Sequence, residues 1–454
     1  MAGRYKPYPE YKDSGVDWIG KIPCDWDMWK ITHACPYVAS GTTPKADGDV
    51  YYGGENLWVT TGELREGVIF DTLKKVTDKA LLDMPTLRLH PRGSVSIAMY
   101  GATIGRLGIF GKEAATNQAC CVMPPSATIQ NKYLFYWLYA TRQEIINLSS
   151  GGGQPNVNQE KIASLKVSCP NYNLQTTIAN FLDHETAKID TLIEKQQQLI
   201  KLLKEKRQAV ISHAVTKGLN PVAKLRDSGI EWLGEVPEHW IVAGFKKYLN
   251  SIVDYRGKTP EKHDSGVFLV TARNIKSGAV NYDASQEYIS EDDYESVMCR
   301  GKPKIGDLLF TTEAPLGEVA SVDREDIALA QRVIKFDGQP GILNNFYLKY
   351  LIMSMQFQQS LMMFSSGSTA PGIKAERFVY LRSLIPPLSE QLEIVDYIES
   401  VAKKIDNLIV KAIDGIEIMQ ERRTALISAA VTGKIDVRGW AAPQDSPTHK
   451  EVAA

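Results

Sequence analysis

The stretch that decides the fold is DSGVDWIGKIP at 13–23, because it returns as DSGIEWLGEVP at 227–237. Six residues of the first copy recur 214 positions later: Asp13, Gly15, Trp18, Gly20, Pro23 and Trp26. The first copy also contains Gly15-x-x-x-x-Gly20-Lys21, which resembles a phosphate-binding loop, but Ile22 replaces the required hydroxyl. The second copy has Glu235 at the lysine position, where a carboxylate would repel phosphate. The shared residues suit a turn packed by indole rings, so the stretch is interpreted as the start of a repeat unit.

The repeat continues through the rest of the chain. SSGGGQPNVNQEKI at 149–162 matches SSGSTAPGIKAERF at 365–378, and RQAVISHAVT at 207–216 matches RTALISAAVT at 423–432. KIDTLIEK at 188–195 likewise matches KIDNLIVK at 404–411. A period of this length is too long for a solenoid, so it indicates a duplicated domain followed by a duplicated helix.

Length and composition favour an ordinary multidomain globular protein. The 454 residues exceed what one core usually serves, and the 44% hydrophobic and 23% charged fractions are typical of globular chains. No apolar run is long enough to span a bilayer, and the N-terminus has no signal-peptide core. Six cysteines without a C-x-x-C pair favour a reducing cytosol, and no zinc-ligand spacing predicts a metal site.

Each repeat begins with a globular part, at about 25–170 and 240–386. Short β-branched and aromatic runs bounded by glycine and proline predict strands. In the first copy these runs are LWVTTGEL, GSVSIAMYG and ACCVMPP; in the second they are VFLVTARNI, GDLLFTTEA and RVIKFDG. One amphipathic helix is expected in each copy, near 131–147 and 345–363. Both globular parts are therefore predicted to be α+β domains.

A long helix follows each globular part. No proline or glycine occurs from Leu174 to Thr216. Apolar residues there follow the 4-3 spacing of a coiled-coil seam, and the seam residues are Ile178, Leu182, Ile189, Leu192, Leu199, Leu203 and Val210. The second copy repeats the pattern at Ile394, Ile398, Val401, Ile405, Leu408, Ala412, Met419 and Leu426. Such a stripe could pack on its own domain, but its presence twice favours pairing of the two helices.

The predicted fold is α+β, with two globular heads joined by two long antiparallel coiled-coil helices in an internal pseudo-two-fold repeat. The expected boundaries are 1–170 for the first head, 171–220 for the first helix, 221–386 for the second head, 387–436 for the second helix and 437–454 for a disordered tail. The helices agree between copies while the heads barely do. Two different recognition surfaces at a fixed spacing suit double-helical nucleic acid.

The chain resembles the specificity subunit of type I DNA restriction-modification enzymes. The resemblance rests on the repeated opener, on the Gly-x-Thr-Pro turn at 41–44 and 257–260, and on SSGGGQPNVN leading into VSCPNYNLQTTIANFL. LIPPLSEQLEIVDYIE and RRTALISAAVTGKI in the second copy are also similar to the family pattern, from which the first copy departs at Asn171 and Tyr172.

The resemblance implies a non-catalytic role in a cytoplasmic host-defence system. Each head would be a target-recognition domain that reads one half of a bipartite, asymmetric site in double-stranded DNA. The helices would set the gap and dock two methyltransferase (modification) subunits, with one or two restriction subunits in the full complex. Those partners would use S-adenosylmethionine, ATP and magnesium, while this chain would need no cofactor. Consistent with this, no Asn-Pro-Pro-Tyr or Asp-Pro-Pro-Tyr methylation motif occurs in the sequence.

Base contacts need polar or basic side chains on loops that enter a groove. In the first head we expect them from Thr42, Thr43, Lys45, Arg65, Arg106, Gln154, Asn156 and Asn158. In the second we expect them from Arg256, Lys258, Arg273, Asn274, Lys276, Arg332, Ser368 and Lys374. For each residue the alternative is an ordinary solvated side chain.

Two other functions stay open at the sequence level. A fused nuclease or methyltransferase with unrecognised motifs would use acidic residues near lysine, such as Asp47 or Glu113. A coiled-coil adaptor would instead bind proteins through its heads.

Overall fold

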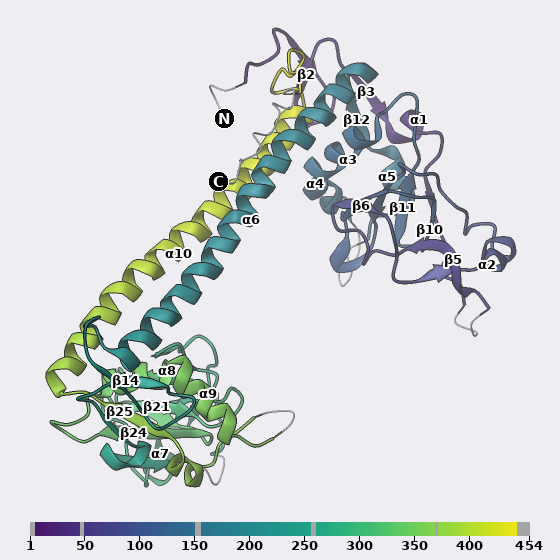
Figure 1. Cartoon of the computed structure of the whole chain (residues 1–454). Coiled ribbons are helices and arrows are strands. Elements are labelled where there is room, and N and C mark those ends of the chain that lie inside the picture. Colours follow the sequence, from purple (N-terminus) through teal and green to yellow (C-terminus); the bar gives the residue numbers. More distant parts are fainter. Residues whose placement is uncertain (1–4, 46–49, 150–155, 256–259, 368–370, 443–454) are drawn as a thin grey trace. The chain divides into compact units, whose positions relative to one another are not determined.

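The computed structural model describes residues 5–45, 50–149, 156–255, 260–367 and 371–442. The chain divides into two compact units, Met1–Lys195 with Asp414–Ala454, and Gln196–Ile413. Both divisions fall inside the long helices α6 (Tyr172–Lys217) and α10 (Leu388–Val431). Each unit therefore holds one head and one part of each long helix (Figure 1).

The repeated opener forms the same hairpin in both units, β1 (Tyr11–Asp13) with β2 (Lys21–Pro23) and β13 (Leu225–Asp227) with β14 (Glu235–Pro237). Gly15 and Gly20 have φ of 65° and 69°, left-handed values that suit glycine. The Asp13 carboxylate accepts a bond from the Gly15 amide at 2.8 Å, and Asp227 does the same for Gly229 at 2.9 Å. The stretch is a structural turn, as the sequence predicted, and Gly20 leads into strand β2 and not into the helix that a phosphate-binding loop requires.

The first head contains two sheets, with strand orders β4-β11-β8-β9-β6 and β10-β5-β7. The strands are β4 (Ala39–Ser40), β5 (Tyr52–Val59), β6 (Gly67–Ile69), β7 (Lys75–Val76), β8 (Val95–Ala98), β9 (Leu107–Phe110), β10 (Ala114–Thr116) and β11 (Cys120–Met123). A further pair joins β3 (Asp27–Lys30) to β12 (Lys166–Cys169). Short helices complete the head: α1 (Ile31–Ala34), α2 (Asp78–Asp83), η1 (Gly101–Thr103) and α5 (Gln159–Ser164).

The second head repeats most of this plan, with sheets β16-β24-β21-β22 and β20-β17-β23, but among the described residues its larger sheet has no strand corresponding to β6. Its strands are β16 (Leu249–Asp254), β17 (Val267–Val270), β18 (Ile275–Lys276), β19 (Ala279–Val280), β20 (Tyr288–Ile289), β21 (Leu308–Thr311), β22 (Val319–Ser321), β23 (Ile327–Leu329) and β24 (Val333–Gly338). The pair β15 (Ile241–Gly244) and β25 (Arg382–Ile385) corresponds to β3 and β12, and η2 (Phe245–Tyr248), α7 (Glu291–Val297) and η3 (Ala375–Val379) are its short helices. Each predicted strand segment contains a strand, so the two heads share a topology that their sequences barely show.

The predicted single helix of each head is in fact two. The first head has α3 (Asn131–Ala140) and α4 (Arg142–Asn147), and the second has α8 (Asn345–Met353) and α9 (Met355–Phe364). Thr141 and Ser354 lie at the breaks, and Ser354 has extended backbone angles while its side chain caps α9 by accepting from the Phe357 amide. In the second head a capping hydroxyl therefore ends one helix and begins the next, which hydrophobic periodicity alone does not reveal.

The two long helices pair in an antiparallel manner in each unit. In the first unit Arg423 of α10 is 2.9 Å from Asp190 of α6, and in the second Arg207 of α6 is 3.3 Å from Asp406 of α10. These pairs are copies of each other, because Asp406 and Arg423 each lie 216 positions after Asp190 and Arg207. Within each unit the paired segments lie side by side (Figure 1), which confirms the predicted antiparallel helix pair.

The predicted seam is displaced in the middle of both helices. Leu192, Leu199 and Leu408 are 51%, 43% and 51% exposed, whereas Ile193, Ile200 and Ile409 are partly buried. The α-helix has 3.6 residues per turn, so a strict seven-residue pattern drifts around it and the inward face moves to the next residue. The residues predicted at the two ends of the seam, among them Ile178, Ile398 and Leu426, are buried as expected.

The start of each long helix is tied to its head by a buried glutamine. Gln175 donates to the carbonyls of Pro170 (2.8 Å) and Thr128 (3.1 Å) and accepts from the Gln130 amide (2.8 Å). Gln391 makes the same three bonds in the second unit, to Pro386, Ile342 and Asn344. The proline-to-glutamine spacing of the sequence pattern is therefore structural.

The end of each long helix is also held by its unit. Tyr133 of α3 donates to the Val431 carbonyl of α10 at 3.1 Å, and Tyr347 of α8 donates to the Val215 carbonyl of α6 at 3.3 Å. These bonds satisfy carbonyls that a helix end leaves without partners. Within the segment expected to be a disordered tail, Val437 is buried and Trp440 packs edge-on against Phe181, while 443–454 lie outside the described residues.

Candidate nucleic-acid interface

The second head has a cleft of about 240 Å³ where the ends of β17, β21 and β23 meet. Two predicted DNA contacts, Arg273 and Arg332, line it together. The other residues around the cleft include Pro260, which ends the Gly-x-Thr-Pro turn, and Lys262, Thr271, Glu287 and Gln331. Loops far apart in the sequence thus gather basic and amide side chains in one place, as base recognition requires.

Charges in this cleft are partly paired. Lys262 is 2.6 Å from Glu287, and Arg332 is 2.7 Å from Glu313. Burial alone would raise the pKa of Glu287, but bonds from Lys262 and Ser285 outweigh it and lower that pKa. Glu287 is therefore ionised at neutral pH and holds Lys262 in place.

Asn274 is not brought to the surface. It is fully buried, it accepts bonds from the amide and hydroxyl of Thr271 (2.9 Å each), and it donates to the carbonyls of Asn281 (2.9 Å) and Ser285 (2.8 Å). Its hydrogen-bonding capacity is used inside the head, so its role in this geometry is to shape the loop that carries Arg273. Lys276 and Lys374 are exposed outside the cleft lining.

The first head forms the corresponding turn without the same charges. Glu63 accepts bonds from the amide and hydroxyl of Thr60, which repeats the arrangement of Asn274 and Thr271. Nearby, Thr43 donates to the Gln118 side chain, and Thr42 contacts Thr86 at 2.6 Å between hydroxyls. The Gly-x-Thr-Pro turn therefore rests on the loop after β10.

The remaining predicted contacts of the first head are spread over its surface. Lys45, Arg65 and Arg106 are exposed, and Arg65 donates to the Gly62 carbonyl at 3.0 Å. Asn156 is exposed and bridges to Tyr100 through its backbone. Asn158 caps α5 by accepting from the Lys161 amide at 2.9 Å, so part of its bonding capacity is already used. Gln154, Arg256, Lys258 and Ser368, and also Asp47, lie outside the described residues.

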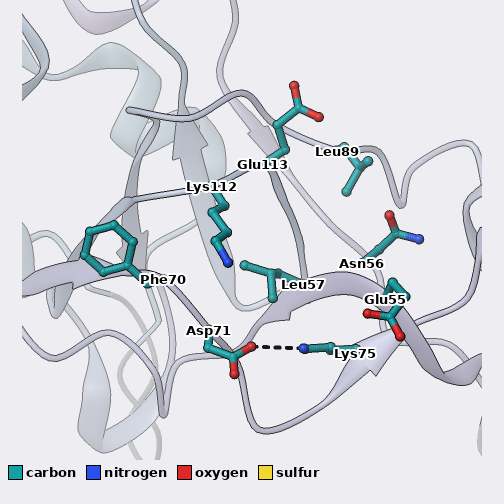
Figure 2. A pocket seen from close by; sticks show the side chains of 9 residues that line it. All are labelled: Glu55, Asn56, Leu57, Phe70, Asp71, Lys75, Leu89, Lys112 and Glu113. Carbon is teal, nitrogen blue, oxygen red and sulfur yellow. Dashed lines mark ion pairs between the residues drawn. The ribbon is translucent and has the colours of Figure 1, made fainter.

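The first head also has a hollow, of about 680 Å³, whose lining mixes carboxylates and lysines (Figure 2). Asp71 pairs with Lys75 at 3.2 Å, and the hydrogen bond from that lysine lowers the pKa of the carboxyl. Glu113 is directed away from Asp71 in Figure 2. Among the described residues no group of three acidic, histidine or cysteine side chains is placed to hold a metal ion.

Several residues in and beside the cleft were missed at the sequence level. Gln331 has a glutamine, Gln118, at the equivalent position of the first copy, and that repetition was a usable signal. Glu313 and Lys262 have no equivalent signal, because a charged loop residue is ordinarily a solvated one. Their positions depend on contacts between distant segments.

The fold is that of a duplicated protein whose two heads share most of their strand order on a common helical frame. The family model for the type I restriction modification DNA specificity domain matches residues 23–202 and 247–417. The chain therefore belongs to the type I restriction-modification specificity family, whose members have a non-catalytic role in DNA recognition.

Individual relatives agree over nearly the full length. The type I restriction enzyme MjaVIII specificity subunit of Methanocaldococcus jannaschii is 23% identical over 92% of this chain and 95% of its own. A solved chain from a study of complex assembly and conformational transition of the type I R-M system matches with a TM-score of 0.68 and 14% identity, over 91% of this chain and 99% of that one. The HsdS subunit from Thermoanaerobacter tengcongensis has a TM-score of 0.52 and 14% identity, over 91% and 98%. These likenesses confirm the predicted fold and family.

In the part of the chain that the structure describes, no helix combines the length and apolar character needed to cross a membrane.

Proposed function

We propose that this chain reads a bipartite, asymmetric site in double-stranded DNA, with one half-site for each head. The observation that carries the proposal is the contrast between frame and loops. Both heads share the order of four strands in the larger sheet and of three in the smaller one, the same Thr-based turn and the same helix attachments, but their loops carry different side chains. A repeated frame with unlike contact residues reads two unlike sequences.

In the second head the proposed contacts are Arg273 and Arg332 with Gln331, at the cleft, and Lys276 and Lys374 beside it. In the first head they are Thr42, Thr43, Lys45, Arg65, Arg106 and Asn156, together with Gln118. Asn158 and Asn274 are assigned positioning roles because their side chains hold backbone groups. The near-zero net charge of −1 means that phosphate contacts must come from such local basic sites.

The long helices are proposed to dock two modification subunits and to set the gap between half-sites. Leu192 and its copy Leu408 are each 51% exposed, and Leu202 and its copy Ile418 are 60% and 65% exposed. Exposed aliphatic residues at matching places in both copies suit two identical partners. The partners would supply S-adenosylmethionine-dependent methylation and, in restriction subunits, ATP- and magnesium-dependent cleavage in the cytoplasm.

Methylation mapping in the host by single-molecule sequencing, with and without this gene, tests the proposal. A gapped, asymmetric adenine-methylated motif should vanish on deletion. A methylome that does not change in a strain that expresses the chain and its partner would refute the proposal and favour the protein-binding adaptor.

Exchange of a head tests the division of labour. Replacing residues 240–386 with the same region of another family member should alter one half of the methylated motif and leave the other half intact. A change in both halves would contradict independent heads.

The docking surface can be tested by native mass spectrometry of the assembled complex. Leu408→Glu should remove one of the two modification subunits, and adding Leu192→Glu should remove both. Val410→Glu is a matched control, because Val410 is equally exposed at 55% but its copy, Glu194, is already charged. Loss of a subunit with the control and not with Leu408→Glu would place the partner elsewhere.

A further inference from the structure

We propose that Glu313 positions Arg332 to read a guanine in the half-site recognised by the second head, an inference that rests on the proposed function. Arg332 is a member of the cleft whose backbone and side chain are both held by one neighbouring segment. Thr312 holds the backbone, and Glu313 holds the guanidinium.

The backbone of Arg332 is fixed in an unusual conformation. Its φ is 77°, in the left-handed region that a residue other than glycine adopts only when its surroundings impose it. Its carbonyl accepts two bonds from the buried Thr312, one from the amide at 2.9 Å and one from the hydroxyl at 3.1 Å. The direction in which the side chain leaves the loop is therefore set before any DNA arrives.

The guanidinium is then held at its inner edge. The contact with Glu313 joins Nε to Oε1 at 2.7 Å, and half of the Arg332 side chain remains exposed. An arginine carries five N–H donors in a rigid plane, and the two terminal nitrogens match the O6 and N7 acceptors of guanine. A carboxylate at Nε restrains that plane and leaves the two terminal nitrogens outside this contact, as a pre-organised reader requires.

The segment directly after β21, which carries Thr312 and Glu313, is itself held by backbone contacts with residues 372 and 373. The Ile373 amide donates to the Thr312 carbonyl at 2.9 Å, and Gly372 forms a bridge with Glu313. A side chain at Gly372 would come within 3.2 Å of Glu313 Cβ, so this close approach uses the glycine. The segment at 372–373 therefore supports the backbone of Thr312 and Glu313.

The first head has the same backbone frame without the pair. Met99 donates to the Ala119 carbonyl at 2.9 Å, as Thr312 does to Arg332, and Val157 donates to the Met99 carbonyl at 3.0 Å, as Ile373 does to Thr312. These bonds place Tyr100 where Glu313 lies and Ala119 where Arg332 lies. The same two positions therefore carry a phenol and a methyl group in one head and a carboxylate and a guanidinium in the other, which makes them specificity-determining positions.

The test uses the host strain with the native gene replaced by Arg332→Lys, Arg332→Ala or Glu313→Gln. Methylation mapping should show that one guanine position of one half-site now accepts other bases, while the other half-site is unchanged. The preference for guanine should fall on the order of 10- to 100-fold for the arginine variants. It should fall less for Glu313→Gln, which leaves the guanidinium present but less restrained.

Arg324→Lys and Asp326→Asn are the matched controls, because these residues form an exposed arginine–carboxylate pair in the same head outside the cleft. Neither should alter the motif. A merely structural role for Glu313 or Arg332 would lower methylation at every site without relaxing any position, and that uniform loss would overturn the proposal. An unchanged motif with Arg332→Lys would overturn it too, because a phosphate contact survives that exchange.

A second readout uses the purified full chain with its modification partner. Once the guanine is mapped, 7-deazaguanine at that position removes the N7 acceptor and should reduce methylation by the wild type but not by Arg332→Ala. Equal reduction in both would contradict the assignment. Failure of the proposed function would look different, since no methylated motif would then depend on the gene at all.

Discussion

Replacing Gln391 with methionine should loosen the attachment of α10 to the second unit. The side chain is fully buried and makes three hydrogen bonds, to the carbonyls of Ile342 (2.7 Å) and Pro386 (2.9 Å) and from the Asn344 amide (2.8 Å). Methionine has a similar volume, so the change removes the bonds with little cavity.

The expected loss of stability follows from the backbone groups that lose their hydrogen-bond partner. Each bond contributes on the order of 1 kcal/mol net, and a buried group left without a partner costs about 1–3 kcal/mol. Three such losses with partial relaxation give about 3 kcal/mol. The loss should be local, because the bonds join the start of α10 to the loop before α8.

Hydrogen exchange followed by mass spectrometry measures the opening free energy of that loop. Amides around Asn344 should lose about 3 kcal/mol of protection in Gln391→Met, while the matching loop around Gln130 in the first unit should not change. Gln175→Met should give the mirror-image result. A loss below about 1 kcal/mol at Asn344, or an equal loss in both loops, would refute the view that this glutamine is the attachment point.

Three further predictions concern pH, helix register and helix ends. Burial, assisted by the Arg88 charge, lowers the pKa of His90 from 6.5 to about 4. As the pH drops below 6.5 the unfolded chain binds a proton that the folded chain does not, so the stability of the folded state falls until the pH reaches about 4. Urea unfolding of the first unit should show about 2 kcal/mol lost between pH 7 and pH 5, and His90→Gln should remove most of that loss. Seven residues inserted after Gln198 in α6 alone should lengthen that helix by about 10 Å, so the Asp190–Arg423 and Arg207–Asp406 pairs cannot both form and assembly should be impaired. A matching insertion after Asp414 in α10 should restore both pairs and lengthen the methylated gap by about three base pairs. In thermal unfolding, Gly433→Ala should destabilise the first unit more than Gly15→Ala does. Both glycines have a left-handed φ, so both substitutions strain the backbone. Only the new Cβ at position 433 would also lie 2.3 Å from Pro23.

The repeat made most of the fold predictable from the sequence. A turn marker such as DSGVDWIGKIP is ambiguous alone, but its second copy with Glu235 excludes a phosphate site and identifies a hairpin. The long helices follow from the lack of proline and glycine over 174–216. The middle of the seam was wrong by one residue, at Leu192, Leu199 and Leu408, because a seven-residue rule does not follow the drift of a 3.6-residue helix.

The site was less predictable because its geometry joins distant segments. Arg273 and Arg332 line one cleft, while Asn274, beside one of them in the sequence, is fully buried. Residue type alone gives the same prediction, DNA contact, for all three residues. Only the tertiary contacts distinguish the buried asparagine from the two arginines in the cleft. The partner of Arg332 is Glu313, 19 positions earlier, and it becomes a neighbour through the pairing of β21 with β24. No local pattern encodes such a contact.

Comparison of the two heads indicates how, under the proposed function, one frame would serve two specificities. Groups that hold the architecture, such as Gln175 with Gln391 and Tyr133 with Tyr347, are buried and bond to corresponding carbonyls in both units, so changing them costs stability wherever they occur. Tyr100 and Glu313 instead stand on equivalent backbone, held by main-chain bonds that do not depend on the side chain. Under the proposed function, a substitution there would change what the loop presents to DNA and leave the sheet intact. Specificity and stability would then be carried by different atoms of the same strand ends, and a head would acquire a new target without a new fold.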